Sequence, residues 1–240
     1  MIQNKTRFEQ SSQEVQLSVI VPTFMERGNI SELIQRAEYA LNPLKFEMII
    51  VDDSSPDGTA EYAEDLNKIY GNIKVVKRCS KLGLSSAVLD GFKKADAKVL
   101  AIMDADLQHP PELLPRMYKM IDCGCDFVVA SRYVDGGRIK DWSLSRRILS
   151  KVALTLAHIL LPKTRKVKDV LSGFFMLKRE AIEDAMLNPV GYKILLELVV
   201  RGRYNSIEEV PFTFRVRKRG KSNLDLREIW NFLVHIFRLL

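Results

Sequence analysis

Short apolar runs alternate with amphipathic stretches along the first half of the chain, and this alternation limits the possible folds more than any other feature. Apolar runs of strand length cover residues 17–23, 46–53, 73–78, 98–106 and 126–132, and the segments between them carry apolar residues at helical spacing. Strands that are apolar on both faces and joined through helices form parallel sheets. The sequence therefore predicts an α/β fold, with a Rossmann-like, mostly parallel sheet and helices on both of its faces.

The second half of the chain departs from this alternation. We expect a long helix over residues 143–161, a strand over 173–179, a helix over 192–200 and a single strand over 207–216. A final amphipathic helix follows, with Asp225 as its N-cap. In the first half, Asn29 is expected to cap the helix that follows the first strand, with Glu32 at the capping-box position.

Acidic side chains follow the end of the fourth predicted strand. Asp104 and Asp106 stand there with Ala105 between them, and Gln108 comes next. Two carboxylates buried together are costly unless a cation neutralises them. Mg²⁺ or Mn²⁺ bound by Asp104, Asp106 and Gln108 would hold a diphosphate. The alternative is that these aspartates only form turns or cap helices.

Other polar side chains end the neighbouring strands. Glu26, Asp53 and Arg132 follow the first, second and fifth strands. Taken alone, Asp52 and Asp53 favour the turn interpretation, because the turn sequence Ser-Ser-Pro-Asp-Gly follows them. Ligands of parallel sheets bind beyond the carboxyl ends of the strands, so one ligand could touch both acidic strand ends. The glycine patterns of dinucleotide and P-loop sites are absent from the sequence.

The net charge of +7 indicates an anionic partner. Basic residues gather at 138–147, 163–168 and 215–221. Nucleic acid is excluded, because these stretches lack interleaved aromatic residues and no nucleic-acid-binding motif is present. The segment 163–168 fits a solvated face, whereas Arg146 and the 215–221 segment fit phosphate binding, which arginine achieves with paired hydrogen bonds.

Six motifs carry a resemblance to a known family. They read PTFMERGNI, VDDSSPDGT, KLGLSSAVLDGF, MDADLQHPPE, VVASRY and SRRILSKVA, in this order along the chain. The chain resembles the inverting glycosyltransferases of the GT-A fold, and within them the dolichyl-phosphate (polyprenol-phosphate) mannose synthases. The resemblance extends from about residue 17 to about residue 223.

The resemblance implies the residues of a donor site and an acceptor site. The nucleotide pocket and the diphosphate site would use residues at the strand ends and in the late basic loop: Pro22, Phe24, Glu26, Val51, Asp53, Asp104, Ala105, Asp106, Gln108, Arg132 and Arg217. Asp104, Asp106 and Arg132 would be the catalytic residues. The lipid phosphate of the acceptor would be received by Arg132, Arg146 and Ser150.

Two positions depart from the family pattern. Ser54 replaces a glycine of the second-strand motif, which we interpret as a tolerated change in a turn. The late loop has Asn223 where the family has a lysine near the diphosphate, and Lys221 and Arg219 are the candidates to replace it. The late loop is therefore the part of the implied site that departs most from the family pattern.

The resemblance also implies a domain plan and a place at a membrane. We expect a disordered arm at 1–14, a catalytic GT-A domain at 15–224 and an amphipathic juxtamembrane helix at 225–240. No segment reaches the ~20 apolar residues of a spanning helix. The C-terminal helix could pack in the core, lie on a bilayer, or precede a membrane-spanning segment or partner subunit. The expected location is the cytoplasmic face of a membrane.

The expected reaction transfers mannose from GDP-mannose to dolichyl (polyprenyl) phosphate with inversion, giving dolichyl phosphate mannose for glycosylation. An acceptor phosphate is already ionised near neutral pH, so the reaction needs no strong general base. One alternative is a polyprenyl-phosphate glucosyltransferase that uses UDP-glucose, and another is a non-catalytic membrane-binding GT-A module. A nucleotidyltransferase is disfavoured, because no glycine-rich basic loop follows the first strand.

Overall fold

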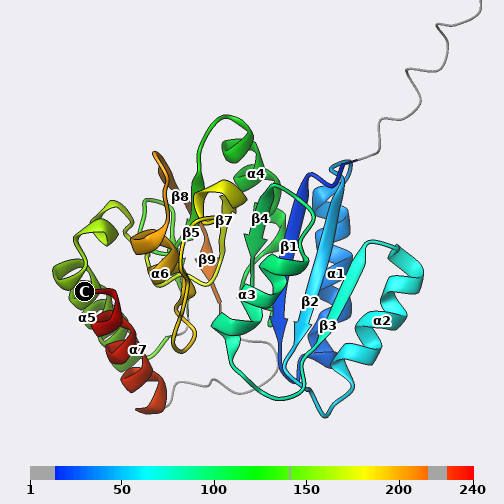
Figure 1. Ribbon diagram of the computed structural model, residues 1–240, viewed down its shortest axis with the longest axis horizontal. Helices are drawn as coiled ribbons and strands as arrows, with labels where there is room; N and C mark the ends of the chain where they lie inside the picture. The colour runs from blue at the N-terminus through cyan, green and yellow to red at the C-terminus, as the bar shows by residue number, and fades with distance from the viewer. Residues whose placement is uncertain (1–13, 141, 216–225) are drawn as a thin grey trace, which may run out of the picture.

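The computed structural model describes residues 14–140, 142–215 and 226–240, and its centre is a seven-stranded sheet. The strand order is β3-β2-β1-β4-β7-β5-β8, and all neighbours are parallel except β7, which runs antiparallel to β4 and β5. The strands are β1 (Leu17–Thr23), β2 (Phe46–Asp52), β3 (Ile73–Lys77), β4 (Val99–Ile102), β5 (Phe127–Ser131), β7 (Phe175–Lys178) and β8 (Ile207–Pro211). The prediction of a mostly parallel α/β sheet is confirmed (Figure 1).

Helices cover both faces of this sheet. The α-helices are α1 (Arg27–Leu41), α2 (Thr59–Tyr70), α3 (Leu84–Lys94), α4 (Leu114–Asp122), α5 (Leu144–Leu160), α6 (Ile194–Arg201) and α7 (Leu226–Leu239). Short 3-10 turns lie at Pro111–Leu113, Pro162–Lys166 and Arg179–Ala181. Successive residues of a strand face opposite sides, so β1 sends Val19 and Val21 into the core under α1 and α4, and Ile20 into the core under α3.

The strand expected over 207–216 is wrong as a single element. It divides into β8 and the two-residue β9 (Thr213–Phe214), which pairs with β6 (Arg138–Ile139) in a separate small sheet. Phe212 lies at the change of partner: its N–H donates to Ser131 O, and its carbonyl accepts from the Arg138 N–H at 3.0 Å. Pro211 just before it has no N–H with which to continue a ladder.

The expected cap of α1 is also wrong. The helix begins at Arg27 with Glu26 as N-cap residue, and the Asn29 side chain instead donates a 2.7 Å hydrogen bond back to the Glu26 carboxylate. The long helix expected at 143–161 is confirmed as α5, and Ser143 caps it by accepting from the Arg146 N–H. Asp225 and the expected arm lie outside the described residues, apart from Glu14. No helix in the described ranges combines the length and apolarity needed to cross a bilayer.

Candidate active site

The carboxyl ends of β1, β2 and β4 lie side by side, because these strands are parallel neighbours. Just past each end one non-glycine residue adopts the left-handed conformation: Met25 and Ser54 at φ 60° and Leu107 at φ 63°. Such backbone is costly for a residue with a Cβ. The turns after β1 and β2 are also tied together, since the Met25 N–H donates to Ser55 Oγ at 2.9 Å. This edge of the sheet is therefore a sharply bent frame held by its own backbone.

Asp104 and Asp106 lie in the turn after β4. The Asp106 side chain is buried and accepts a 3.0 Å bond from the Gln108 N–H, whereas the Asp104 carboxyl is 30% exposed. The Asp104 N–H donates to His109 Nδ1 at 3.0 Å. Burial lowers the pKa of His109 to about 4, so the ring is neutral at pH 7 with its proton on Nε2. His109 therefore fixes the backbone of the Asp-Ala-Asp turn.

The carboxylates and amide of this turn fit a hard divalent cation. Mg²⁺ and Mn²⁺ take a few oxygen ligands and fill their remaining positions with water and substrate phosphate. In the described part of the chain, no group of three or more His, Cys, Asp or Glu residues could hold a metal ion. A cation bound by the two carboxylates and the Gln108 amide would therefore need water or substrate phosphate to complete its coordination. Gly173 leaves room for them, because a Cβ there would stand 3.4 Å from Asp104 Oδ2. The Gln108 Nε2 donates to the Arg215 carbonyl, which orients the amide.

The residues expected around the nucleotide are found at the ends of β1 and β2, but several are already engaged. Asp53 is buried and forms an ion pair with Arg78, while its other oxygen accepts from the Gly83 N–H at 2.8 Å. Lys81 places its ammonium 3.7 Å from the centre of the Phe24 ring. A base that stacks on Phe24 would have to share that ring with Lys81 or displace it.

The strand residues that are expected in the nucleotide pocket have buried side chains. Pro22 and Val51 are direct partners in the β1–β2 ladder, and both are buried. The Val51 side chain belongs to the core under α3. Ala105, between the two aspartates, is also buried, in the core on the opposite face. Arg217, Arg219, Lys221 and Asn223 lie outside the described residues.

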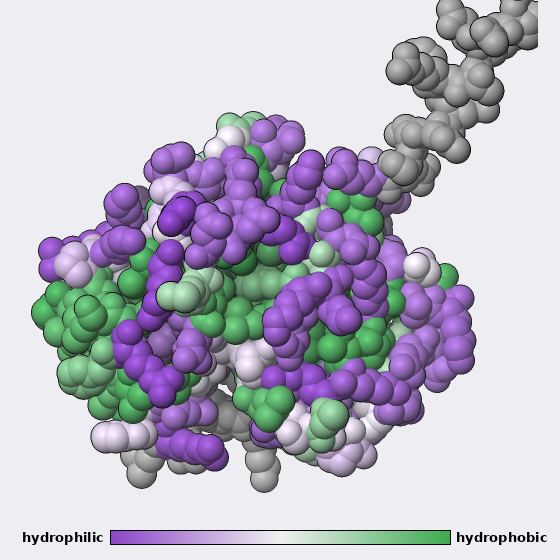
Figure 2. Space-filling view, in the orientation of Figure 1, coloured by the Kyte–Doolittle hydropathy of each residue, from purple (hydrophilic) through white to green (hydrophobic). Residues whose placement is uncertain are grey.

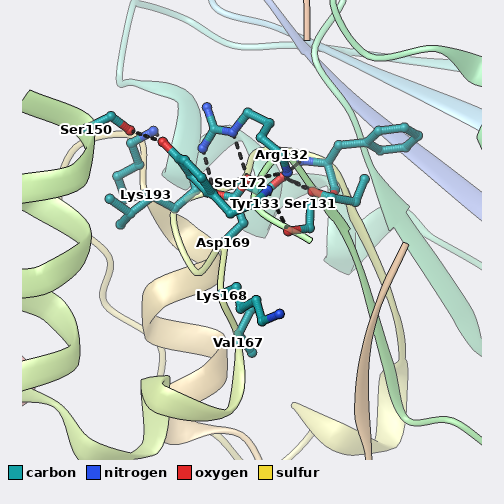
Figure 3. A network of polar contacts seen from close by, with 12 residues as sticks. Ser131, Arg132, Tyr133, Ser150, Val167, Lys168, Asp169, Ser172 and Lys193 are labelled. Atoms are coloured by element: carbon teal, nitrogen blue, oxygen red, sulfur yellow. Dashed lines mark hydrogen bonds and ion pairs between the residues drawn. The ribbon is translucent and has the colours of Figure 1, made fainter. Parts of the chain in front are cut away.

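Arg132, just past β5, is held rigidly by Asp169. Its Nε and Nη2 each donate to one oxygen of the Asp169 carboxylate at 2.7 Å, and its backbone N–H donates to the same group at 2.9 Å (Figure 3). Burial would lower the pKa of Arg132, but the charge and hydrogen bonds of Asp169 outweigh burial and raise it, and Asp104 adds to the increase. Contacts also join the arginine to the acidic turn, because the Phe214 ring beside Arg132 lies 6.1 Å from the His109 ring, which accepts from the Asp104 N–H.

Aromatic rings surround the same guanidinium. Its central carbon lies 5.4 Å from the ring centre of Trp142, 5.5 Å from that of Phe214 and 5.6 Å from that of Tyr133. The Trp142 ring also lies 4.4 Å from the guanidinium carbon of Arg146, so one indole holds both arginines. The two arginines expected near phosphate are thus brought together through a residue that the sequence did not single out.

Ser150, the third residue expected at the acceptor, faces this cluster from α5. Its hydroxyl lies 3.0 Å from the Tyr133 hydroxyl, and Tyr133 directly follows Arg132 (Figure 3). Asp169, Tyr133, Trp142, His109 and Lys193 all belong to this region and were missed from the sequence. His109 and Tyr133 stand inside two of the recognised motifs, which was the available signal. Asp169 and Lys193 give no local signal, because Arg132 and Leu171, which they bond, are distant along the chain. Trp142 lies four residues before Arg146, but it stands outside the recognised motifs.

Comparison with known proteins identifies the family of this chain. The family model described as Glycosyl transferase family 2 matches residues 18–185. The chain belongs to this glycosyl transferase family. A dolichol-phosphate mannosyltransferase of Pyrococcus furiosus is 47% identical over 226 residues, which are 94% of this chain and 64% of the relative. The chain therefore spans slightly less than two thirds of that relative's length.

Two further comparisons agree with this membership. A dolichol-phosphate mannosyltransferase of Saccharomyces cerevisiae is 38% identical, with 94% of this chain and 87% of the relative covered. The predicted resemblance is thus confirmed. Among solved structures of the GT-A type, glucosyl-3-phosphoglycerate synthase from Mycobacterium tuberculosis, in complex with Mn²⁺, UDP-glucose and phosphoglyceric acid, superposes with a TM-score of 0.69 at 21% identity, over 94% of this chain and 78% of the other. The similarity to this solved structure supports the fold described above.

Proposed function

We propose that this chain transfers mannose from GDP-mannose to dolichyl (polyprenyl) phosphate with inversion. One observation carries the proposal: the acidic turn at Asp104 and Asp106 adjoins a cluster of arginines built from Arg132 and Arg146. A site of this kind has one side suited to a metal-bound diphosphate and one side suited to a second phosphate. The names of the 47% and 38% identical relatives supply the sugar and the lipid.

The donor would bind at the ends of β1, β2 and β4. Asp104, Asp106 and Gln108 would hold Mg²⁺ or Mn²⁺, which when bound neutralises charge on the diphosphate and stabilises it as leaving group. Phe24, Glu26 and Asp53 would face the nucleoside, and the backbone of Pro22, Val51 and Ala105 would line its path. Arg217 would reach the diphosphate from the late loop.

The acceptor phosphate would bind between Arg132, Arg146 and Ser150. One of its oxygens attacks the anomeric carbon of mannose, the bond from that carbon to the GDP oxygen breaks, and GDP leaves with the electron pair. The phosphate oxygen is already ionised near pH 7, so no proton must be removed. The chain contributes position and positive charge, in keeping with a neutral, buried His109 that supports Asp104.

The lipid would arrive from a membrane along the outer face of α5. Leu144, Ile148 and Val152 stand at successive helical turns on this face and are 74%, 54% and 57% exposed. Trp230 and Phe237 on α7 are 67% and 69% exposed. Apolar colour covers the side of the molecule where α5 and α7 lie (Figure 2). Exposed apolar side chains gathered in this way fit the surface of a bilayer.

A panel of donors tests the reaction. Purified protein is given radiolabelled GDP-mannose or UDP-glucose, with polyprenyl phosphate or the matching polyprenol, in Mg²⁺, Mn²⁺ or chelator. We expect label in the lipid phase only with GDP-mannose, the phosphorylated lipid and a divalent cation, and a product of inverted anomeric configuration by NMR. Label from UDP-glucose alone would favour the glucosyltransferase, and no transfer from any donor would reject the proposal.

A further inference from the structure

Lys193 stands beside the arginine cluster and has no role in the site described so far. It is the residue just before α6, and its Nζ donates a 3.1 Å hydrogen bond to the Leu171 carbonyl. Leu171 belongs to the turn that begins at Asp169, which holds Arg132. In Figure 3 the Lys193 side chain points toward the pair formed by Tyr133 and Ser150.

Among the described residues, the carboxylates that act on this ammonium are those of Asp169 and Asp104. The pKa of Lys193 is lowered to about 8, first by burial and then by the charges of Arg132 and Arg146, against the opposing charges of Asp169 and Asp104. Among the described residues, Arg132 and Lys193 thus lie within the electrostatic reach of the same two carboxylates. One of these, Asp169, is saturated by Arg132, and the other, Asp104, would serve the divalent cation.

A lysine in such a place needs an anion that these residues do not provide. An ammonium has three N–H donors. In the described part of the chain, the Lys193 ammonium donates to the Leu171 carbonyl and lies 4.5 Å from the centre of the Tyr192 ring. Clustered like charges are unfavourable in a partly buried site unless an anion bridges them. A phosphate monoester, with a charge of about −1.5 to −2 near pH 7 and three acceptor oxygens, has the charge and the number of acceptors required.

The position of Lys193 is fixed by α7. Gly191, two residues earlier, packs so closely on this helix that a Cβ would come 3.1 Å from the Asn231 Cβ and 3.2 Å from Glu228 Oε2. One turn into α6, buried Glu197 accepts a 2.6 Å bond from the Asn188 N–H and contacts His235 of α7 at 3.0 Å. The segment before Lys193 is therefore clamped at both ends, which leaves little conformational freedom to lose when a ligand binds.

We propose that Lys193 is a third cationic ligand of the acceptor phosphate, completing a receiver formed with Arg132 and Arg146. The inference rests on the proposed function, since it assigns the anion to the acceptor. A charge-assisted hydrogen bond to phosphate contributes about 1.5–3 kcal/mol, which corresponds to a roughly 10- to 150-fold change in affinity. Lys193 therefore acts on the lipid phosphate, and the donor diphosphate is bound without it.

The first test compares Lys193→Met with Lys193→Arg, and with Lys151→Met as a matched loss of one exposed charge on α5. We expect Lys193→Met to raise the KM for polyprenyl phosphate about tenfold or more, and Lys193→Arg to recover part of this loss. The Kd of GDP with Mn²⁺ should stay within about twofold, and Lys151→Met should leave both constants unchanged. An unchanged acceptor KM, or an equal loss of GDP affinity, overturns the proposal.

A second measurement separates this inference from the proposed reaction, because it uses no donor. Binding of a short prenyl phosphate and of the matching prenyl alcohol is measured by calorimetry. Wild type should prefer the phosphate, and Lys193→Met should lose most of that preference even if no mannose transfer were found. Equal binding of phosphate and alcohol by wild type overturns the inference. Lys193→Met should not lower the melting temperature, because it removes a half-buried positive charge that lies near other positive charges. A lysine with a purely structural role would instead lower the melting temperature when it is replaced.

Discussion

The two sides of the candidate site are built in different ways. On the donor side, the polar side chains come from short sequence segments at adjacent strand ends, and the left-handed residues Met25, Ser54 and Leu107 bend the backbone beneath them. On the acceptor side, Arg132 is held by the side chain of Asp169, which lies 37 residues further along the chain. The donor side therefore depends on backbone geometry, and the acceptor side on pairs of side chains. Mutations on the donor side should accordingly lower the catalytic rate, and mutations on the acceptor side should lower the free energy of unfolding.

The largest expected effect is on the acceptor side. Asp169→Ala leaves the buried Arg132 guanidinium without its carboxylate, and breaking a buried pair in this way costs about 3–5 kcal/mol. Urea denaturation measures the loss. Asp184→Ala is the control, because its pair with Arg203 is largely exposed and should contribute less than about 1 kcal/mol. Equal losses for the two variants would show that the acceptor side does not depend on its buried pair.

The donor side should show the opposite balance. Asp106→Asn keeps the shape of the side chain but removes a charge proposed to hold the divalent cation, so kcat/KM for GDP-mannose should fall by about a hundredfold, roughly 2.7 kcal/mol of transition-state stabilisation. The free energy of unfolding should change little. Asp122→Asn, at the exposed end of α4, is the matched control. Full activity of Asp106→Asn would remove Asp106 from the proposed metal site.

The two faces of α7 offer a third contrast. His235 is buried against Glu197, so His235→Ala should lower the free energy of unfolding by about 2 kcal/mol and speed amide exchange in α7 before α1. Phe237 is 69% exposed, and Phe237→Ala should leave stability within about 0.5 kcal/mol while weakening sedimentation with lipid vesicles. If Phe237→Ala bound vesicles as wild type does, this face of α7 would not be the lipid contact.

The smallest expected effect sharpens the description of the donor frame. Ser54 is exposed at φ 60°, where a Cβ costs about 1–2 kcal/mol, whereas glycine loses about 0.5–1 kcal/mol through its freer unfolded chain. Ser54→Gly should therefore stabilise the protein by less than about 1 kcal/mol. Ser145→Gly, within α5, should change stability in the opposite direction. A lower melting temperature for Ser54→Gly would show that the serine side chain has a role of its own.

The same contrast explains what could be predicted from the sequence. The strand pattern and the spacing Asp104-Ala105-Asp106 are local, and they were sufficient to place the fold and the acidic turn. The change of partner at Phe212 depends on β6, which lies more than 70 residues earlier, and no local pattern encodes it. The pairing of Arg132 with Asp169 and the approach of Lys193 to Leu171 are long-range in the same sense.

Side-chain competition accounts for the remaining differences. Asn29 is of a residue type that commonly caps helices, but Glu26 takes the N-cap position of α1. The Asn29 side-chain amide therefore donates to the Glu26 carboxylate instead. The sequence predicts that Asp53 either binds the ligand or forms a turn. It does not predict the ion pair of Asp53 with Arg78. The role of Arg217 and of the substitution at Asn223 lies outside the described residues and stays a prediction.

The two faces of α5 have a consequence for how the reactants meet. Ile148, on the exposed apolar face, and Ser150, on the face toward Tyr133, are two residues apart, which is about 3 Å along a helix axis. If α5 rests on a bilayer, the depth of the helix sets the height of the phosphate receiver at the level of the lipid headgroups. The search for the acceptor then takes place in two dimensions instead of three, and the tail of the lipid never has to leave the membrane. Selection of the acceptor would be shared with the bilayer itself, whereas selection of the sugar nucleotide is left to the strand ends alone.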